Sequence, residues 1–173
     1  MHAYNYMQMH FQGSPNMAEK RVKLISSDND EFEVDEAVAF ESETLRNMIQ
    51  DTGTNVPISI PNVSSDILAK VLEYCSYHAE TMETHDDKPP ITDAQIREWD
   101  ADFVDVHPAT LYSLILAANY LNIKNLLDLI CQAVANNIRG KTAVEIRKIL
   151  HIQDDFTYEE EMEIRRETKW AFD

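Results

Sequence analysis

The stretch VKLISSDNDEFEV, residues 22–34, decides the fold of the first part of this chain. Val22 and Leu24 alternate with other side chains before a Ser-Asp-Asn-Asp cluster, and Phe32 and Val34 alternate with acids after it. Alternation with a period of two predicts half-buried strands, and Ser, Asp and Asn are typical turn residues. The stretch therefore predicts a β-hairpin.

A helix and a third strand are expected after the hairpin. Residues 41–50 place Leu45, Met48 and Ile49 on one face of a helix. The segment PISIP, residues 57–61, predicts a short strand because it has a proline at each end.

A longer helix follows, with Ser64 as its predicted N-cap. Its apolar residues recur at the i, i+3, i+4, i+7 and i+8 spacing of one helix face. They are Ile67, Leu68, Val71, Leu72 and Cys75.

The remaining segments predict helices, whose ends are marked by capping residues. Capping boxes, in which a Thr and a Glu or Gln three residues later satisfy backbone N–H groups, are expected at Thr92, Thr142 and Thr157. Pro108 suits the first turn of another helix, and Gly140 suits the end of the next. The sequence therefore predicts an α+β fold, a small sheet with helices followed by a helical extension.

These features divide the chain into five predicted segments. The first contains three methionines and a Gly-Ser pair without hydrophobic periodicity, which is typical of a tag remnant or a disordered leader. The expected segments are the leader (1–16), the first part of the main domain (17–80), a mobile acidic loop (81–91), the helices of the same domain (92–139) and the C-terminal helices (140–173).

The net charge of −16 is concentrated in one half of the chain. The segment 26–107 contains 20 acidic and 4 basic residues. Such a surface repels phosphate backbones, so we expect no nucleic-acid partner there. Two interpretations stay open from charge alone, a basic protein partner and simple solubility.

The sequence predicts neither a membrane segment nor a secreted protein. No run of 18 apolar residues is present, and no basic flank precedes an apolar stretch at the N-terminus. The two cysteines, Cys75 and Cys131, are too few for a disulfide scaffold. We expect both to be buried thiols in a reducing compartment.

Motifs for a cofactor or a metal are not apparent. Gly13, Gly53 and Gly140 are isolated, whereas a phosphate-binding loop needs several clustered N–H groups. Cys75 and His78 could share a helix face, but zinc needs two further ligands at suitable spacing. We therefore predict no metal and no cofactor.

One fragment, His107-Pro108-Ala109, faintly resembles the His-Pro-Asn of ubiquitin-conjugating enzymes. That chemistry needs a nucleophilic cysteine shortly afterwards, but the next one is Cys131, within an apolar stripe. The fragment is better interpreted as the start of a helix, so the sequence predicts no enzyme.

Several longer motifs together resemble the S-phase kinase-associated protein family, the adaptors of SCF ubiquitin ligases. The resemblance covers about residues 22–173, and the ending WAFD looks most like plant members. The motifs are WD-x-x-F at 99–103, ILAANYLNIKNLLD at 115–128, IRGKT at 138–142, EIRK at 145–148, DDFT at 154–157 and RRE-x-x-W at 165–170.

This resemblance implies a BTB/POZ fold with two added C-terminal helices. The BTB/POZ part would bind a cullin through Tyr112, Asn119 and Tyr120. The C-terminal helices would hold the F-box motif of a substrate receptor through an apolar surface. The matching residues are Leu127, Val134, Ile138, Ile146, Leu150, Ile152, Phe156 and Trp170.

The family further implies a non-catalytic subunit that promotes substrate ubiquitination and proteasomal degradation. Through the cullin and the F-box protein it would reach a RING protein and a ubiquitin-conjugating enzyme, in the nucleus and cytoplasm, without nucleic acid or membrane. From the residues alone, Trp170 could equally fold back onto Ile146 and Ile149; the resemblance favours an interface role.

The chain departs from the family pattern on the proposed F-box surface. Ala143 and Val144 stand where the family usually has Pro-Glu, Leu150 where a Phe is common, and His151 where Asn is usual. No prolyl modification can occur there, and receptor preference is put in doubt.

Two alternatives stay open: a BTB-type protein that self-associates or serves a membrane-ring or kinetochore assembly, and a conjugating-like enzyme with a thioester on Cys75 or Cys131.

Overall fold

The computed structural model describes residues 20–82, 91–149 and 157–167. It divides into two compact units, and the boundary between them in the sequence lies between Asn137 and Ile138. The elements in the described residues are β1 (Arg21–Ile25), β2 (Glu31–Asp35), α2 (Glu36–Ala39), α3 (Glu43–Thr52), β3 (Ile58–Ser59), α4 (Ser65–Met82), α5 (Asp93–Phe103), α6 (Pro108–Tyr120), α7 (Lys124–Ile138), α8 (Ala143–Ile149) and α9 (Tyr158–Glu167).

The predicted hairpin is confirmed. Strands β1 and β2 pair antiparallel, with Val22 opposite Val34 and Leu24 opposite Phe32, and all four side chains are buried. Strand β3 also forms where the prolines predicted it. It pairs parallel to β1, with Leu24 opposite Ile58, so the strand order is β2-β1-β3.

The outward side of the sheet is charged. Lys23 contacts the Glu31 carboxylate at 2.7 Å, and Arg21 contacts Asp35 at 3.4 Å. Opposite charges on neighbouring strands add to sheet stability. The larger contribution comes from the apolar side chains on the inward side, which are buried in the core.

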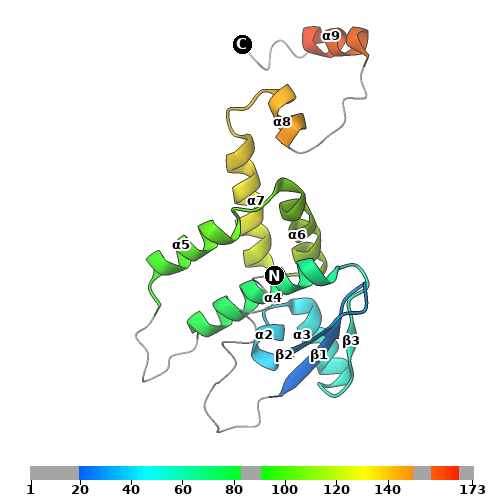
Figure 1. Cartoon of the computed structure of the whole chain (residues 1–173), viewed down its shortest axis with the longest axis vertical. Helices are drawn as coiled ribbons and strands as arrows, with labels where there is room; N and C mark the ends of the chain where they lie inside the picture. Colours follow the sequence, from blue (N-terminus) through cyan, green and yellow to red (C-terminus); the bar gives the residue numbers. More distant parts are fainter. Residues whose placement is uncertain (1–19, 83–90, 150–156, 168–173) are drawn as a thin grey trace. The chain divides into compact units, whose positions relative to one another are not determined.

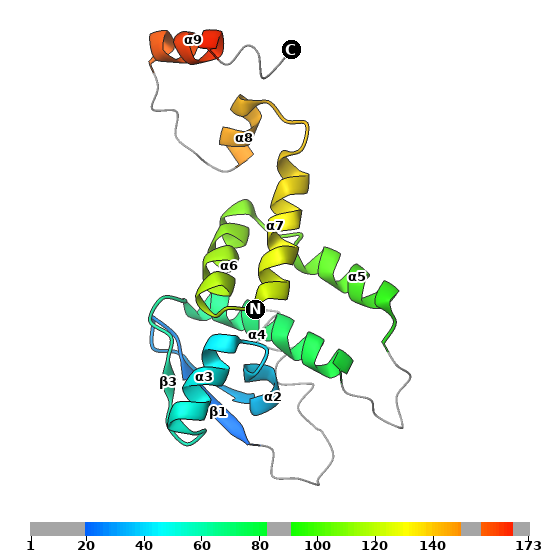
Figure 2. The same ribbon diagram turned by 180° about the vertical axis from the view of Figure 1, so that it is seen from behind.

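Helix α4 lies between two groups of elements in the first unit (Figures 1 and 2). The sheet with α2 and α3 lies on one side of it, and α6 and α7 lie on the other. This central place explains why all five residues of its predicted apolar stripe are buried.

The start of α4 depends on a distant carboxylate. Ser64 precedes the helix as predicted, but its hydroxyl donates to the carboxylate of Asp66. The carboxylate of Asp28, in the hairpin turn, instead accepts from the N–H of Ser65 at 2.8 Å and from its hydroxyl at 2.6 Å. These bonds lower the pKa of Asp28 to about 2.

Helix α5 is attached to α4 mainly through aromatic side chains. The rings of Tyr77 and Trp99 are stacked with centroids 4.1 Å apart, and Trp99 stacks on Phe103 at 5.1 Å. Beside them, His78 Nε2 lies 2.9 Å from a carboxylate oxygen of Asp100. Flat rings in contact bury large areas, so this cluster fixes the position of α5.

The end of α6 is joined to the start of α3. The Ser42 hydroxyl is buried, donates to the carbonyl of Leu121 at 2.6 Å and accepts from the N–H of Leu45 at 3.1 Å. Thr44 adds a bond from its hydroxyl to the carbonyl of Tyr120 at 3.1 Å. The carbonyls at the end of α6, which lack partners within the helix, therefore accept hydrogen bonds from the start of α3.

All three predicted capping boxes form. In each, the Thr hydroxyl accepts from the backbone N–H three residues later, and the Glu or Gln side chain accepts from the Thr N–H. The same bonds lower the pKa of Glu145 and Glu160. Pro108 opens α6 as predicted, and Gly140 has φ +71°, the left-handed conformation expected just after a helix.

Two expectations are corrected. Cys75 is buried, but Cys131 is exposed, because Leu126 and Ile130 face the core and each residue turns a helix by about 100°. Helix α4 extends to Met82, so it includes the first two residues of the predicted loop 81–91. The rest of that loop to residue 90, and the predicted leader, lie outside the described residues.

Replacement of Ser42 by Ala should destabilise the first unit. The substitution removes an N-cap and the hydroxyl donor of the Leu121 carbonyl, which keeps only the 3.4 Å bond from the N–H of Thr44, and should cost about 1–3 kcal/mol. Urea unfolding followed by circular dichroism measures this. Ser113→Ala is the matched control, because that hydroxyl bonds only within α6, to Ala109. Equal losses in the two variants would contradict the role of Ser42.

Asp28 should make stability fall in acid. Its pKa is about 2 in the folded protein and 3.8 as an unperturbed group, so its contribution is fully present above about pH 4 and is lost as pH falls toward 2. Unfolding midpoints in urea between pH 2 and 4 should therefore depend less on pH in Asp28→Asn and in Ser65→Ala than in the wild type. Three profiles with the same slope would be evidence against this bond.

Candidate partner-binding surfaces

One side of α6 packs in the core and the other carries large apolar side chains in solvent. Leu111 and Leu114 are buried, whereas Tyr112 is 64% exposed and Leu116 is 52% exposed. Tyr112 and Leu116 are four residues apart and therefore lie on the same helix face. Exposed apolar groups that lie together are typical of a protein-binding surface.

The structure brings the predicted cullin-binding residues to this face. Asn119 is exposed and lies two turns beyond Tyr112. Tyr120 is half-buried because its side chain packs partly against the core, and its carbonyl accepts from the hydroxyl of Thr44. Sequence reasoning did not single out Leu116, which is exposed on the same face. Its spacing of four from Tyr112, outside the core stripe of α6, could have identified it.

The predicted F-box-binding residues are only partly described. Leu127 and Val134 on α7 are half-buried against the core of the first unit. Ile138 and Ile146, in the second unit, are also half-buried. The other four lie outside the described residues and stay predictions: Leu150, Ile152, Phe156 and Trp170.

The second unit differs from the first in its burial. Among its described side chains, on α8, on α9 and in the turns that precede them, none is buried. Four large apolar side chains there are exposed: Val144, Tyr158, Met162 and Ile164. Short helices without tertiary packing are marginally stable, so a partner that covers these side chains would stabilise the unit.

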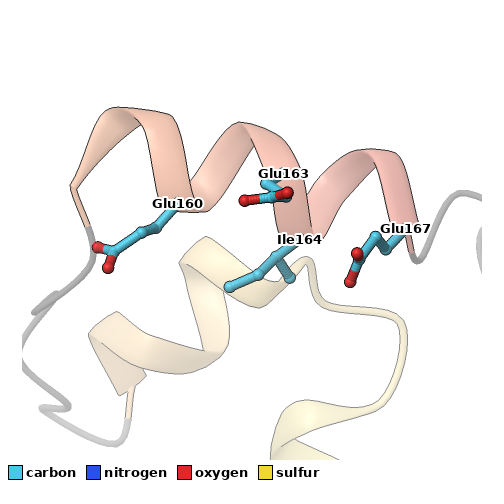
Figure 3. A pocket seen from close by; sticks show the side chains of 4 residues that line it. All are labelled: Glu160, Glu163, Ile164 and Glu167. Carbon is cyan, nitrogen blue, oxygen red and sulfur yellow. The ribbon is translucent and has the colours of Figure 1, made fainter.

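Helix α9 also presents carboxylates along one side (Figure 3). Glu160, Glu163 and Glu167 flank Ile164 around a shallow depression. Across the described part of the chain, no group of three or more His, Cys, Asp or Glu side chains could hold a metal ion. The depression therefore offers carboxylates without the further ligands of a zinc site.

The side chains considered for catalysis or metal binding have structural roles in the first unit. His107 Nδ1 accepts from the N–H of Ala109 at 3.2 Å, so the imidazole caps α6, as the interpretation of a helix start predicted. Cys75 lies in the core, and burial raises the pKa of its thiol. His78, the possible metal ligand beside Cys75, contacts Asp100.

No helix in the described ranges is long and apolar enough to cross a membrane.

Comparison with known proteins identifies the family. Residues 20–80 match the Skp1 family tetramerisation domain, and residues 124–171 match the Skp1 family dimerisation domain. The chain is 51% identical to SKP1-like protein 1A of Arabidopsis thaliana over 91% of its own length and all of that protein. The chain belongs to the Skp1 family.

Other members of the Skp1 family give the same result. SKP1-like protein 1 of Oryza sativa is 54% identical, over 89% of this chain and 96% of that protein. Suppressor of kinetochore protein 1 of Schizosaccharomyces pombe is 48% identical, over 88% of this chain and 98% of that protein. The predictions of the family, of an α+β fold of BTB/POZ type and of an SCF adaptor are therefore confirmed.

The two cysteines should differ sharply in reactivity. Cys131 is exposed, whereas Cys75 is enclosed and its thiol holds its proton. Iodoacetamide at neutral pH should modify Cys131 at least about tenfold faster than Cys75, as measured by mass spectrometry of tryptic peptides. Denaturant should abolish the difference; similar rates in the folded protein would show that the core around Cys75 is open.

Proposed function

We propose that this Skp1 family chain bridges two proteins without catalysing a reaction. A cullin would dock on the exposed face of α6, and an F-box receptor would dock on the C-terminal helices. Tethering both partners raises the effective concentration of a receptor-bound substrate near the ubiquitin-loading machinery, which promotes its degradation.

The observation that carries the proposal is the unequal burial of the two units. The first unit has a closed core and an exposed apolar face on α6, and the described C-terminal helices expose apolar side chains without burying any. Covering such side chains stabilises a complex by roughly 25 cal/mol per Å² of apolar area, before the cost of ordering. Two separate surfaces of this kind suit a bridge.

The absence of catalysis is part of the proposal. A conjugating-like mechanism needs a thiolate, and burial disfavours the thiolate of Cys75. Cys131 is exposed on α7. Among the described residues, no histidine or carboxylate is hydrogen-bonded to its thiol to activate it. A ubiquitin-loading assay that found a thioester on either cysteine would overturn this part.

The wider setting follows the family expectation. The cullin would bring a RING protein and a ubiquitin-conjugating enzyme, and the complex would act in the nucleus and cytoplasm. Imaging of the tagged chain in its native cells would test this location.

Self-association is a second candidate. It is supported by the name of the matched first domain, a tetramerisation domain, and a kinetochore role is supported by the name of the fission-yeast relative. Light scattering of the isolated chain would detect self-association. A monomer at micromolar concentration would exclude this candidate and retain the adaptor role.

The two proposed surfaces should be separable. Removal of residues 157–173, which takes away α9 and Trp170, should abolish binding of an F-box protein while cullin binding persists. Trp170→Ala alone should cost about 2 kcal/mol or more, as a tryptophan interface anchor does. Pull-downs with both partners measure this.

The reciprocal variant tests the other surface. Tyr112→Ala combined with Leu116→Ala removes the two exposed apolar groups of α6 and should weaken cullin binding by about tenfold or more, with F-box binding unchanged. Each variant is the other's control for folding. Loss of both partners in either variant would contradict the two-surface arrangement.

A further inference from the structure

The exposed face of α6 is uncharged although the surrounding unit is strongly acidic. None of the 13 residues of α6 is Asp, Glu, Lys or Arg. The segment 26–107, which provides β2, β3 and α2 to α5, has 20 acids against 4 bases, and β1 adds the bases Arg21 and Lys23. Tyr112 and Leu116 therefore form an apolar patch on an acidic unit.

Acids stand at both ends of this patch. Asp102 and Asp105 are exposed just before α6 begins. Glu43 is exposed just beyond its end, where Asn122 donates to its carboxylate. An apolar centre with a charged rim is the usual anatomy of a protein interface.

The nearby bases, which include the exposed Lys124 just after α6, are fewer than the acids, although their contacts leave their own charges in place. The Arg46 guanidinium donates to the carbonyl of Phe40 at 2.6 Å and lies 5.6 Å over its ring. Lys70 lies 5.5 Å over the ring of Phe103. The ion pairs found among the described residues involve Arg21, Lys23 and His78 instead. Because the segment 26–107 has 20 acids and only 4 bases, the net field of this unit is negative around α6.

We infer that the partner of α6 presents an apolar centre with a basic rim, and that the acids at the ends of α6 steer its approach. This rests on the proposed function, in which the partner is a cullin, and it adds the chemistry by which that surface is recognised. A second copy of this chain fits poorly, because it would bring a net charge of −16 against the same charge. Steering acts on the rate of association, whereas the apolar contacts set the rate of dissociation.

The experiment measures binding kinetics between the full chain and a purified cullin by stopped flow, from about 50 to about 500 mM NaCl. We expect the association rate constant to fall about tenfold or more over this range, because salt screens exposed charges, while the dissociation rate constant changes little. Binding of an F-box protein to the same chain serves as the internal comparison and should depend less on salt.

Matched charge variants locate the effect. Asp102→Asn with Asp105→Asn removes two acids at the start of α6. Glu33→Gln with Asp51→Asn removes one acid from β2 and one from the far end of α3. The first pair should lower the low-salt association rate constant at least about threefold more than the second, because steering is strongest from charges beside the contact.

Each other outcome would overturn the inference in a distinguishable way. A cullin that binds through Tyr112 with a salt-independent association rate would refute steering and leave the proposed function intact. Equal effects of the two charge pairs would refute the rim at α6. A chain that binds no cullin at any salt concentration, or that forms dimers lost on Tyr112→Ala in light scattering, would refute both the inference and the cullin-binding role of α6.

Discussion

The buried hydroxyl of Ser42, with the bonds of Thr44 beside it, ties the end of α6 to the start of α3, and the position of α6 depends on this link. It bonds the carbonyl of Leu121 and the N–H of Leu45, and so joins two helix ends that are 79 residues apart in the sequence. Because the end of α6 is held in this way, its inner side stays in the core and its outer side presents Tyr112 and Leu116. A polar contact in the interior thus fixes an apolar contact surface outside.

Local patterns in the sequence predicted the elements, and non-local contacts were not predictable. The hairpin, the α4 stripe and the three capping boxes follow from residues close together in the chain. The parallel direction of β3, the bond of Asp28 to Ser65 and the bond of Ser42 to Leu121 depend on segments that meet only after folding. The cullin-facing residues came from family resemblance. The expectation of a buried Cys131 treated it as part of the surrounding apolar stripe, although it lies about 100° around the helix from the buried Ile130.

The two units obtain their stability from different sources. In the first, buried aliphatic side chains from the sheet and from α3, α4, α6 and α7 form one core. In the second, capping boxes at Thr142 and Thr157 define the helix starts, and the described side chains contribute no buried core. Capping specifies where a helix begins but supplies only about 1 kcal/mol, so the second unit is suited to ordering on a partner.

The stacked cluster at α5 has an optical consequence. The chain has two tryptophans, and Trp99 lies in the first unit against the rings of Tyr77 and His78, while Trp170 belongs to the second. Each unit thus carries its own intrinsic fluorophore. Replacing one indole by phenylalanine would leave the emission of the other, so fluorescence can report on each unit separately.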